Sequence, residues 1–193
     1  MKGLPVVWFV SDPDRTPDPV AVARTLPRGT GVIFRHFGRP GAEAMAQRLA
    51  KVALRRGLVL LIGADEAMAA SVGAAGVHLP ERLAGTALRL KARHTGWIVT
   101  AAAHSAHAVR RAGGADAVLL STVFASNSPS AGPPLGPVRL ATIARGAPLP
   151  VYALGGVNGR TAGRLVGTGV VGFAAVEGLG SALNSPYSRR PAT

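Results

Sequence analysis

Short apolar runs alternate with alanine-rich amphipathic runs along almost the whole chain. Eight apolar runs have the length and composition of strands, at residues 4–11, 31–36, 58–62, 76–79, 97–102, 117–123, 150–154 and 170–176. The runs between them predict helices at residues 19–25, 41–56, 66–74, 82–93, 106–112, 138–145 and 160–166, with a short last helix at 181–184. The strands are apolar throughout rather than at every second position, which is typical of a parallel sheet covered by helices.

Strands that alternate with helices in this way predict an α/β fold, a small (β/α)₈ TIM barrel of parallel strands with outer helices. With a repeat of about 24 residues, the barrel lies near the lower size limit for that fold. A doubly wound open sheet is the competing architecture, but it normally carries a glycine fingerprint after its first strand, and residues 9–13 contain no glycine. We therefore expect one barrel domain over residues 1–184, followed by a disordered tail at 185–193.

The composition limits the class of protein and its compartment. With 193 residues, of which 48% are hydrophobic, the chain can fill one such domain but not two large ones. The sequence contains no cysteine, which excludes disulfides and cysteine-based metal sites and fits a reducing cytoplasm. The first apolar run is too short to cross a membrane, and no small-residue cleavage site follows it. We expect a cytoplasmic protein without a membrane partner.

The formal net charge is +13, which can mark a surface that binds nucleic acid. Here the positive charge comes almost entirely from arginines scattered along the predicted helices, where they alternate with alanine and not with aromatic residues. No basic tract of five or more residues exists. This pattern is typical of a solvated helical surface and makes nucleic acid the least favoured partner, although the charge attracts anionic substrates. The sequence leaves open whether the chain forms a homodimer.

The clearest site signal is the pair Gly155 and Gly156, which directly follows the apolar run 150–154. Adjacent glycines allow a loop to point several backbone N–H groups into one small volume, which is how many proteins hold a phosphate. In a parallel barrel, phosphate sites recur in the loops after strands seven and eight, and the eighth predicted strand ends at Val176. Ser126 and Ser128 lie in the longest loop, residues 125–136, where their hydroxyls either donate to phosphate oxygens or simply form turns.

Other residues at strand ends are candidates for chemistry, because the loops after barrel strands meet at one mouth. Arg35 ends the second strand and is either an anion contact or an ordinary rim arginine. His104 follows the fifth strand, and an imidazole suits proton transfer. His78, inside the fourth strand, is more simply a core histidine. Glu177 follows the eighth strand, where a carboxylate would repel a bound phosphate unless it points away, binds a metal or acts as an acid/base group.

The sequence contains no other acidic pair or His/Asp cluster with the spacing of metal ligands. Asp65 is the candidate ligand if a metal binds at all, because it follows the third strand. Asp12 follows the first strand and could meet Asp65 at the barrel mouth.

Several segments, taken in order, resemble the thiamine phosphate synthase/TenI family. They are residues 76–80 (Gly-Val-His-Leu-Pro), 114–118 (Gly-Ala-Asp-Ala-Val), 123–124, 150–157 and 172–176, and the resemblance extends from Trp8 to Gly178. The family implies a (β/α)₈ barrel of thiamine biosynthesis. Its synthase branch implies a transferase that joins hydroxymethylpyrimidine pyrophosphate to thiazole phosphate with Mg²⁺. Its TenI branch implies an isomerase of thiazole carboxylate phosphate.

The resemblance assigns the phosphate end of the ligand to Gly155, Gly156 and Val176, with hydroxyls from Ser126 and Ser128. The glycine pair matches that of the family, and the two serines stand where the family places hydroxyls, so the resemblance implies a partner that is a small phosphorylated thiazole.

The pyrophosphate and metal end of the family site departs from its pattern. Arg35 matches the arginine of a Gln-x-Arg-x-Lys pattern, but Ile33 replaces the Gln and Phe37 the Lys. Four further departures are Gly63-Ala64 for Asn-Asp (with Asp65 one residue later), Leu83 for Asp, Ala102 for Ser and Pro129 for Lys. Together they remove the positive charge and metal ligands that loss of pyrophosphate requires.

His104 falls where TenI-type tautomerases carry a histidine, in the sequence Ala-Ala-His-Ser. We therefore expect a thiazole-phosphate-binding barrel with His104 as proton-transfer group, Arg35 as anion contact and Glu177 as a further candidate catalytic residue. This reaction needs no cofactor. The alternatives are a divergent synthase, in which Asp65 and Glu177 or the substrate phosphates would hold Mg²⁺, and a non-catalytic regulatory barrel that binds a phosphorylated ligand.

Overall fold

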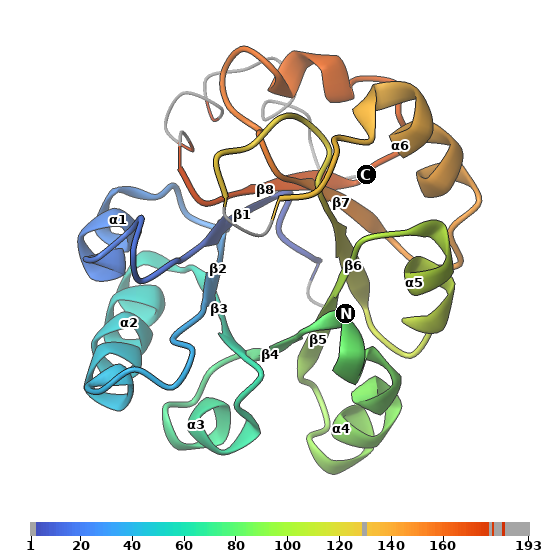
Figure 1. Cartoon of the computed structure of the whole chain (residues 1–193). Helices are drawn as coiled ribbons and strands as arrows, with labels where there is room; N and C mark the ends of the chain where they lie inside the picture. Colours follow the sequence, from blue (N-terminus) through green and yellow to red (C-terminus); the bar gives the residue numbers. More distant parts are fainter. Residues whose placement is uncertain (1–2, 129–130, 178, 180–182, 184–193) are drawn as a thin grey trace.

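The computed structural model describes residues 3–128 and 131–177, together with residues 179 and 183. Eight parallel strands form a closed barrel in sequence order, with β1 hydrogen-bonded to β8 and Val7 opposite Phe173 (Figure 1). The strands are β1 (Val7–Val10), β2 (Gly31–Phe34), β3 (Val59–Gly63), β4 (Gly76–Leu79), β5 (Ile98–Ala103), β6 (Ala117–Leu120), β7 (Val151–Leu154) and β8 (Gly172–Ala175). The predicted (β/α)₈ barrel is confirmed, and the open sheet is not formed.

Helices surround the ring of strands, as Figure 1 shows. They are α1 (Pro19–Thr25), α2 (Ala42–Arg56), α3 (Glu66–Ser71), α4 (Ala87–Arg93), α5 (Ala106–Arg111) and α6 (Gly136–Arg145), with the 3₁₀ helices η1 (Glu81–Thr86) and η2 (Ala162–Leu165). In the described part of the chain, none of the helices has the length and apolar character that a membrane span requires.

Three predicted elements differ in form. The predicted helix at 82–93 is split into η1 and α4, and the one at 160–166 is reduced to η2; Gly85 and Gly163 lie inside these segments and lower their helix propensity. Strand β6 ends three residues early because the chain then crosses to the end of β7, where the N–H of Val123 donates to the carbonyl of Leu154. The predicted tail at 185–193 and, apart from residue 183, the predicted helix at 181–184 lie outside the described residues.

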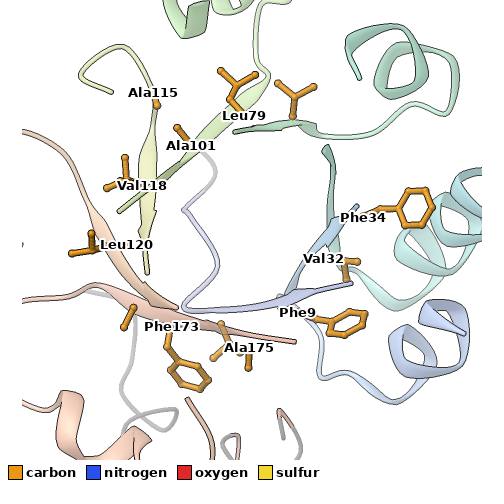
Figure 2. Close-up of a cluster of buried hydrophobic side chains, with 14 of the residues drawn as sticks. Phe9, Val32, Phe34, Leu79, Ala101, Ala115, Val118, Leu120, Phe173 and Ala175 are labelled. Carbon is orange, nitrogen blue, oxygen red and sulfur yellow. The ribbon is translucent and has the colours of Figure 1, made fainter. Parts of the chain in front are cut away.

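The apolar strands bury both of their faces, as expected for a barrel covered by helices. Along β1 the side chain of Phe9 faces outward and joins the layer between strands and helices, whereas Trp8 and Val10 belong to the cluster inside the barrel. Figure 2 shows Phe9, Phe34 and Phe173 of the outer layer pointing away from the barrel axis. Successive side chains thus lie on opposite faces of the strand, and both faces are buried, so an uninterrupted apolar run indicates a strand in this barrel.

Two large aromatic residues fill the interior near the amino-terminal ends of the strands. Trp8 and Tyr152 are fully buried and meet edge to face, with ring centroids 6.2 Å apart. A Cβ on Gly31 would lie 2.1 Å from the indole of Trp8, and one on Gly172 would lie 2.6 Å from the ring of Tyr152. These two glycines at the strand starts make room for the aromatics. The bottom of the barrel is therefore packed solid, and open space remains at the carboxyl ends of the strands.

Candidate functional site

A pocket of about 450 Å³ opens at the carboxyl ends of the strands. It brings together most of the residues that the sequence analysis selected: Arg35, Asp65, His78, His104, Ser126, Ser128, Gly155 and Val176. Gly156 and Glu177 lie outside the residues that line it. The charged side chains in the lining are Arg15, Arg35, Arg82 and Asp65. Arginine outnumbers carboxylate in this lining, so the pocket attracts anions.

The glycine loop after β7 lies close against the loop after β6. Gly155 and Gly156 have φ angles of +93° and +64°, which other residues rarely adopt. A Cβ on Gly155 would lie 2.8 Å from Cγ2 of Thr122, and one on Gly156 would lie 2.3 Å from the carbonyl oxygen of Ala125. Within the described residues, the N–H groups of both glycines donate no backbone hydrogen bond, and Gly155 lines the pocket. Backbone donors of this kind suit phosphate.

Ser126 and Ser128 follow β6 and line the pocket next to this loop. The hydroxyl oxygen of Ser126 accepts a hydrogen bond from the N–H of Ser128, with the two atoms 3.3 Å apart. The turn thus gives Ser126 a local role, and it also leaves the hydroxyl hydrogen of Ser126 free to point toward a ligand. Both interpretations of these serines are compatible with the geometry.

Arg35 is fixed at the end of β2 by contacts to the end of β1. Its Nε donates to the carbonyl of Ser11 at 2.8 Å and its Nη2 to Oδ2 of Asp12 at 3.2 Å. Burial lowers the pKa of the Arg35 guanidinium, while the charge of Asp12 opposes that effect. Burial raises the pKa of Asp12, but hydrogen bonds from Arg15 outweigh it and hold that pKa below its ordinary value. Arg35 and Asp12 are therefore both charged at neutral pH.

His104 lies at the rim of the pocket and is paired with Glu81, the first residue of η1. Oε2 of Glu81 accepts from the backbone N–H of His104 at 2.8 Å and lies 2.7 Å from Nδ1 of its ring. An ionised carboxylate only accepts hydrogen bonds, so Nδ1 carries the hydrogen and Nε2 holds the lone pair in the neutral ring. The side chain is 59% exposed and can reach a ligand at the mouth.

His78 is buried inside β4, and its Nδ1 lies 2.9 Å from Oγ1 of Thr100. Burial lowers the pKa of His78 to about 3, with a smaller contribution from the charge of Arg35. The ring is therefore neutral at physiological pH. It combines the two roles considered from the sequence, because it is a hydrogen-bonded core residue and also lines the pocket.

The carboxylates at the mouth are each engaged by other groups. Oδ1 of Asp65 accepts from the N–H of Met68 and caps α3, and its Oδ2 lies 3.7 Å from Nε2 of His36. Asp12 is held by arginines, and Glu177, whose side chain is 58% exposed, has its Oε2 3.8 Å from Nη1 of Arg15. In the described part of the chain, no three His, Cys, Asp or Glu side chains gather in a way that could hold a metal ion.

Four pocket or rim residues with titratable side chains were not selected from the sequence: Arg15, His36, Glu81 and Arg82. Glu81 comes two residues after β4 and His36 two residues after β2, so the rule that strand ends converge could have found both. Arg15 comes five residues after β1, and its position depends on the turn in which Thr16 bonds back to Asp12. That turn carries no sequence signal specific enough to predict the direction of the Arg15 side chain.

The site is a cationic pocket at the carboxyl end of a closed (β/α)₈ barrel, with a glycine loop and a histidine–carboxylate pair at its mouth. These features place the chain among barrels whose pocket is suited to small anionic molecules. The family model described as thiamine monophosphate synthase matches residues 9–179. The chain therefore belongs to the thiamine phosphate synthase/TenI family, a family of enzymes of thiamine biosynthesis that act on a phosphorylated thiazole.

Individual relatives agree with this assignment. The thiamine-phosphate synthase of Marinobacter nauticus is 32% identical over 185 residues, which cover 91% of this chain and 82% of the relative. The putative thiamine-phosphate synthase 2 of Aquifex aeolicus is 35% identical over 102 residues, covering 52% of this chain and 54% of the relative. The structure of thiamine phosphate pyrophosphorylase from Pyrococcus furiosus superposes with a TM-score of 0.74 at 22% identity, covering 89% of this chain and 84% of that one. This last similarity supports the fold.

Proposed function

We propose that this chain binds a phosphorylated thiazole and moves a proton on its ring, as a thiazole tautomerase of the TenI type. The observation that carries the proposal is the pairing of His104 with Glu81 at the rim of the pocket that the glycine loop also lines. A proton shuttle and a phosphate anchor at one mouth are what such a reaction requires. The departures at Phe37, Leu83 and Ala102 support the same choice, because they affect groups needed only for loss of pyrophosphate.

The residues divide the work as follows. The N–H groups of Gly155 and Gly156, with the Ser126 hydroxyl, hold the phosphate. Nε2 of His104 takes a proton from one position of the thiazole, and Glu81 stabilises the imidazolium that forms. The imidazolium then returns a proton to a second position, so the product is an isomer of the substrate. No bond to a leaving group breaks, and the reaction needs no electron acceptor.

The donor set at the mouth does not fit Mg²⁺ well. Mg²⁺ prefers carboxylate oxygens in an octahedral arrangement with waters. Asp65 uses one oxygen to cap α3, and Asp12 is neutralised by Arg15 and Arg35. No step of the proposed reaction passes through a metal ion.

The test follows the ring protons of thiazole carboxylate phosphate by NMR in deuterated water with the purified protein. We expect isomerisation with wild-type protein and a loss of about 100-fold or more in rate with His104→Ala, the order of a general acid–base contribution. His107→Ala is the matched control, because His107 is an exposed histidine on α5 outside the pocket lining. Equal rates in His104→Ala and wild type would contradict the proposal.

A divergent synthase is the second candidate, and the names of the similar relatives favour it. It predicts Mg²⁺-dependent formation of thiamine phosphate from hydroxymethylpyrimidine pyrophosphate and thiazole phosphate. Binding of thiazole phosphate without turnover in either assay would instead support a non-catalytic regulatory barrel.

A further inference from the structure

Ser121 lies beside His104 at the carboxyl ends of β6 and β5. Ala103 is opposite Leu120 in the register of these two strands. The ladder continues by one residue, because the N–H of Ser121 donates to the carbonyl of Ala103 at 3.0 Å. The next pair across the strands is therefore His104 and Ser121, and both residues line the pocket.

The side chain of Ser121 faces the interior of the barrel. Along β6, Leu119 belongs to the cluster inside the barrel, whereas Leu120 packs outward against the helices. Because side chains alternate along a strand, Ser121 points inward again. Its hydroxyl makes no hydrogen bond within the described part of the chain. The pocket wall thus carries a nucleophilic group that no structural contact occupies.

His104 has the arrangement of a general base for this hydroxyl. Oε2 of Glu81 holds its Nδ1 at 2.7 Å, so Nε2 keeps the lone pair in the neutral ring. A serine hydroxyl is a weak nucleophile until a neighbouring base takes its proton. The hydroxyl of Ser121 and the ring of His104 are not hydrogen-bonded among the described residues, and such bonds often tighten only when a substrate binds.

The glycine loop after β7 places backbone donors next to this serine. A Cβ on Gly155 would lie 3.1 Å from Cα of Thr122, the residue that follows Ser121. The N–H groups of Gly155 and Gly156 donate no backbone hydrogen bond in the part of the chain that the structure describes. Backbone N–H groups beside a nucleophile stabilise the oxyanion that forms when it attacks a carbonyl.

We propose that Ser121 as nucleophile, His104 as base and Glu81 as positioning residue form a site that hydrolyses small carboxylic esters. This activity is distinct from the proposed isomerisation, which uses His104 but not Ser121. Carboxylate, imidazole and serine are linked in this order in hydrolases of several unrelated folds. Because arginines line the pocket, esters that carry an anionic group are the favoured substrates.

The reaction has two halves. Oγ of Ser121 attacks the carbonyl carbon while Nε2 of His104 takes its proton, and the carbonyl oxygen becomes an oxyanion at the glycine loop. The oxyanion collapses, the bond to the alcohol breaks, and the imidazolium gives its proton to the leaving oxygen. Water then attacks the acyl-serine and gives a proton to His104, which returns it to Oγ as the carboxylic acid leaves.

The experiment measures hydrolysis of p-nitrophenyl acetate by the purified protein. We expect Ser121→Ala and His104→Ala each to lower kcat/KM by about 100-fold or more, since each removes a group on which the others depend. Ser71→Ala is the matched control, because Ser71 is an exposed serine of α3 outside the pocket lining. Thermal unfolding of each variant checks that the barrel is intact. Among uncoloured esters, 4-acetoxybenzoate should be hydrolysed faster than phenyl acetate, and the reverse order would overturn the preference for anionic esters.

The variants separate the ways in which the proposal could fail. If His104→Ala loses hydrolysis but Ser121→Ala keeps the wild-type rate, the imidazole attacks the ester directly and Ser121 is not the nucleophile. If wild-type protein is no faster than His104→Ala, the site does not hydrolyse esters.

A fluorophosphonate reagent gives an independent readout of the nucleophile. Mass spectrometry should find the reagent on Ser121 of wild-type protein, and labelling should be lost in His104→Ala; modification of another serine instead would contradict the proposal. Isomerisation of the thiazole should be unchanged in Ser121→Ala. Failure of ester hydrolysis therefore leaves the proposed function standing, and failure of isomerisation leaves the hydrolysis result unaffected.

Discussion

Glu81 accepts two hydrogen bonds from His104, one from the backbone N–H at 2.8 Å and one from the ring Nδ1 at 2.7 Å. The first bond ties the end of β5 to η1, and the second sets the orientation of the imidazole. A single carboxylate oxygen therefore fixes both the position of the histidine and the nitrogen that faces away from it. This relationship makes Glu81 a positioning residue for the proposed proton transfer.

The first prediction concerns Glu81→Gln. The amide keeps an acceptor for the backbone N–H but loses the negative charge that stabilises the imidazolium, so kcat should fall by about 10-fold or more with KM little changed. Initial rates of isomerisation over a range of substrate concentrations give both constants.

The chain offers a matched control for this substitution. Glu66 pairs with Nε2 of His94 at 2.6 Å, and neither residue lines the pocket. Glu66→Gln should leave kcat and KM as in wild type. An equal kcat in Glu81→Gln and wild type would contradict the role of Glu81 in the proton transfer.

The second prediction concerns Glu177, whose role the sequence left open. Its carboxylate is 3.8 Å from Arg15 and competes with any anion that approaches this arginine. Glu177→Gln should strengthen the binding of inorganic phosphate or thiazole carboxylate phosphate about two-fold at low salt, and less at high salt, because an exposed charge is well screened. Calorimetric affinities at two ionic strengths measure it.

Glu43→Gln is the control for the general effect of removing one negative charge, since Glu43 is an exposed residue of α2. Equal gains in Glu43→Gln and Glu177→Gln would assign the effect to net charge and not to the contact with Arg15.

The sequence predicted the barrel well because burial on both faces of parallel strands leaves a clear signal. Trp8, Ile33 and Leu61 fill the interior while Phe9 and Phe34 face the helices, so nearly all strand positions are apolar. The tight loop after β7 was also predictable, because two adjacent glycines are typical of a backbone that other residues rarely adopt. Both signals are short stretches of sequence, and neither depends on the direction of a particular side chain.

The charge pairs of the site were not predictable in the same way. Residues that are 23 positions apart, such as Asp12 and Arg35, meet only when neighbouring strands are in register. The same is true of Glu81 and His104. For Glu177, the position directly after β8 was evident from the sequence, but the direction of the side chain was not. That side chain lies near Arg15, which belongs to the loop after β1.

The third prediction tests the glycine loop with Gly156→Ala. The new Cβ would lie 2.3 Å from the carbonyl oxygen of Ala125, at a φ of +64°, so the loops after β6 and β7 must separate. We expect a loss of about 1–3 kcal/mol in the free energy of unfolding and clearly weaker binding of thiazole phosphate. Urea unfolding and calorimetry measure the two effects.

Gly163→Ala is the control for this glycine, because no atom lies within 4 Å of the Cβ that it would add. It should keep wild-type affinity and be equally or more stable. If Gly156→Ala bound thiazole phosphate as tightly as wild type, the loop would not be the phosphate anchor.

The last prediction uses the buried imidazole of His78. Its pKa in the folded state is about 3, below the ordinary 6.5. Between these two pH values the imidazole of His78 is protonated in the unfolded chain and neutral in the folded chain. The contribution of His78 to stability is therefore present above pH 6.5 and declines as the pH falls toward 3, by at most about 1.4 kcal/mol for each pH unit.

His78→Gln removes the titratable imidazole and keeps a polar group near Thr100. Relative to wild type, the variant should gain about 2 kcal/mol in the free energy of unfolding between pH 7 and pH 5, measured by urea titration. If the difference between variant and wild type is the same at both pH values, His78 is able to take up a proton in the folded barrel, and the neutral ring assigned to the pocket wall is wrong.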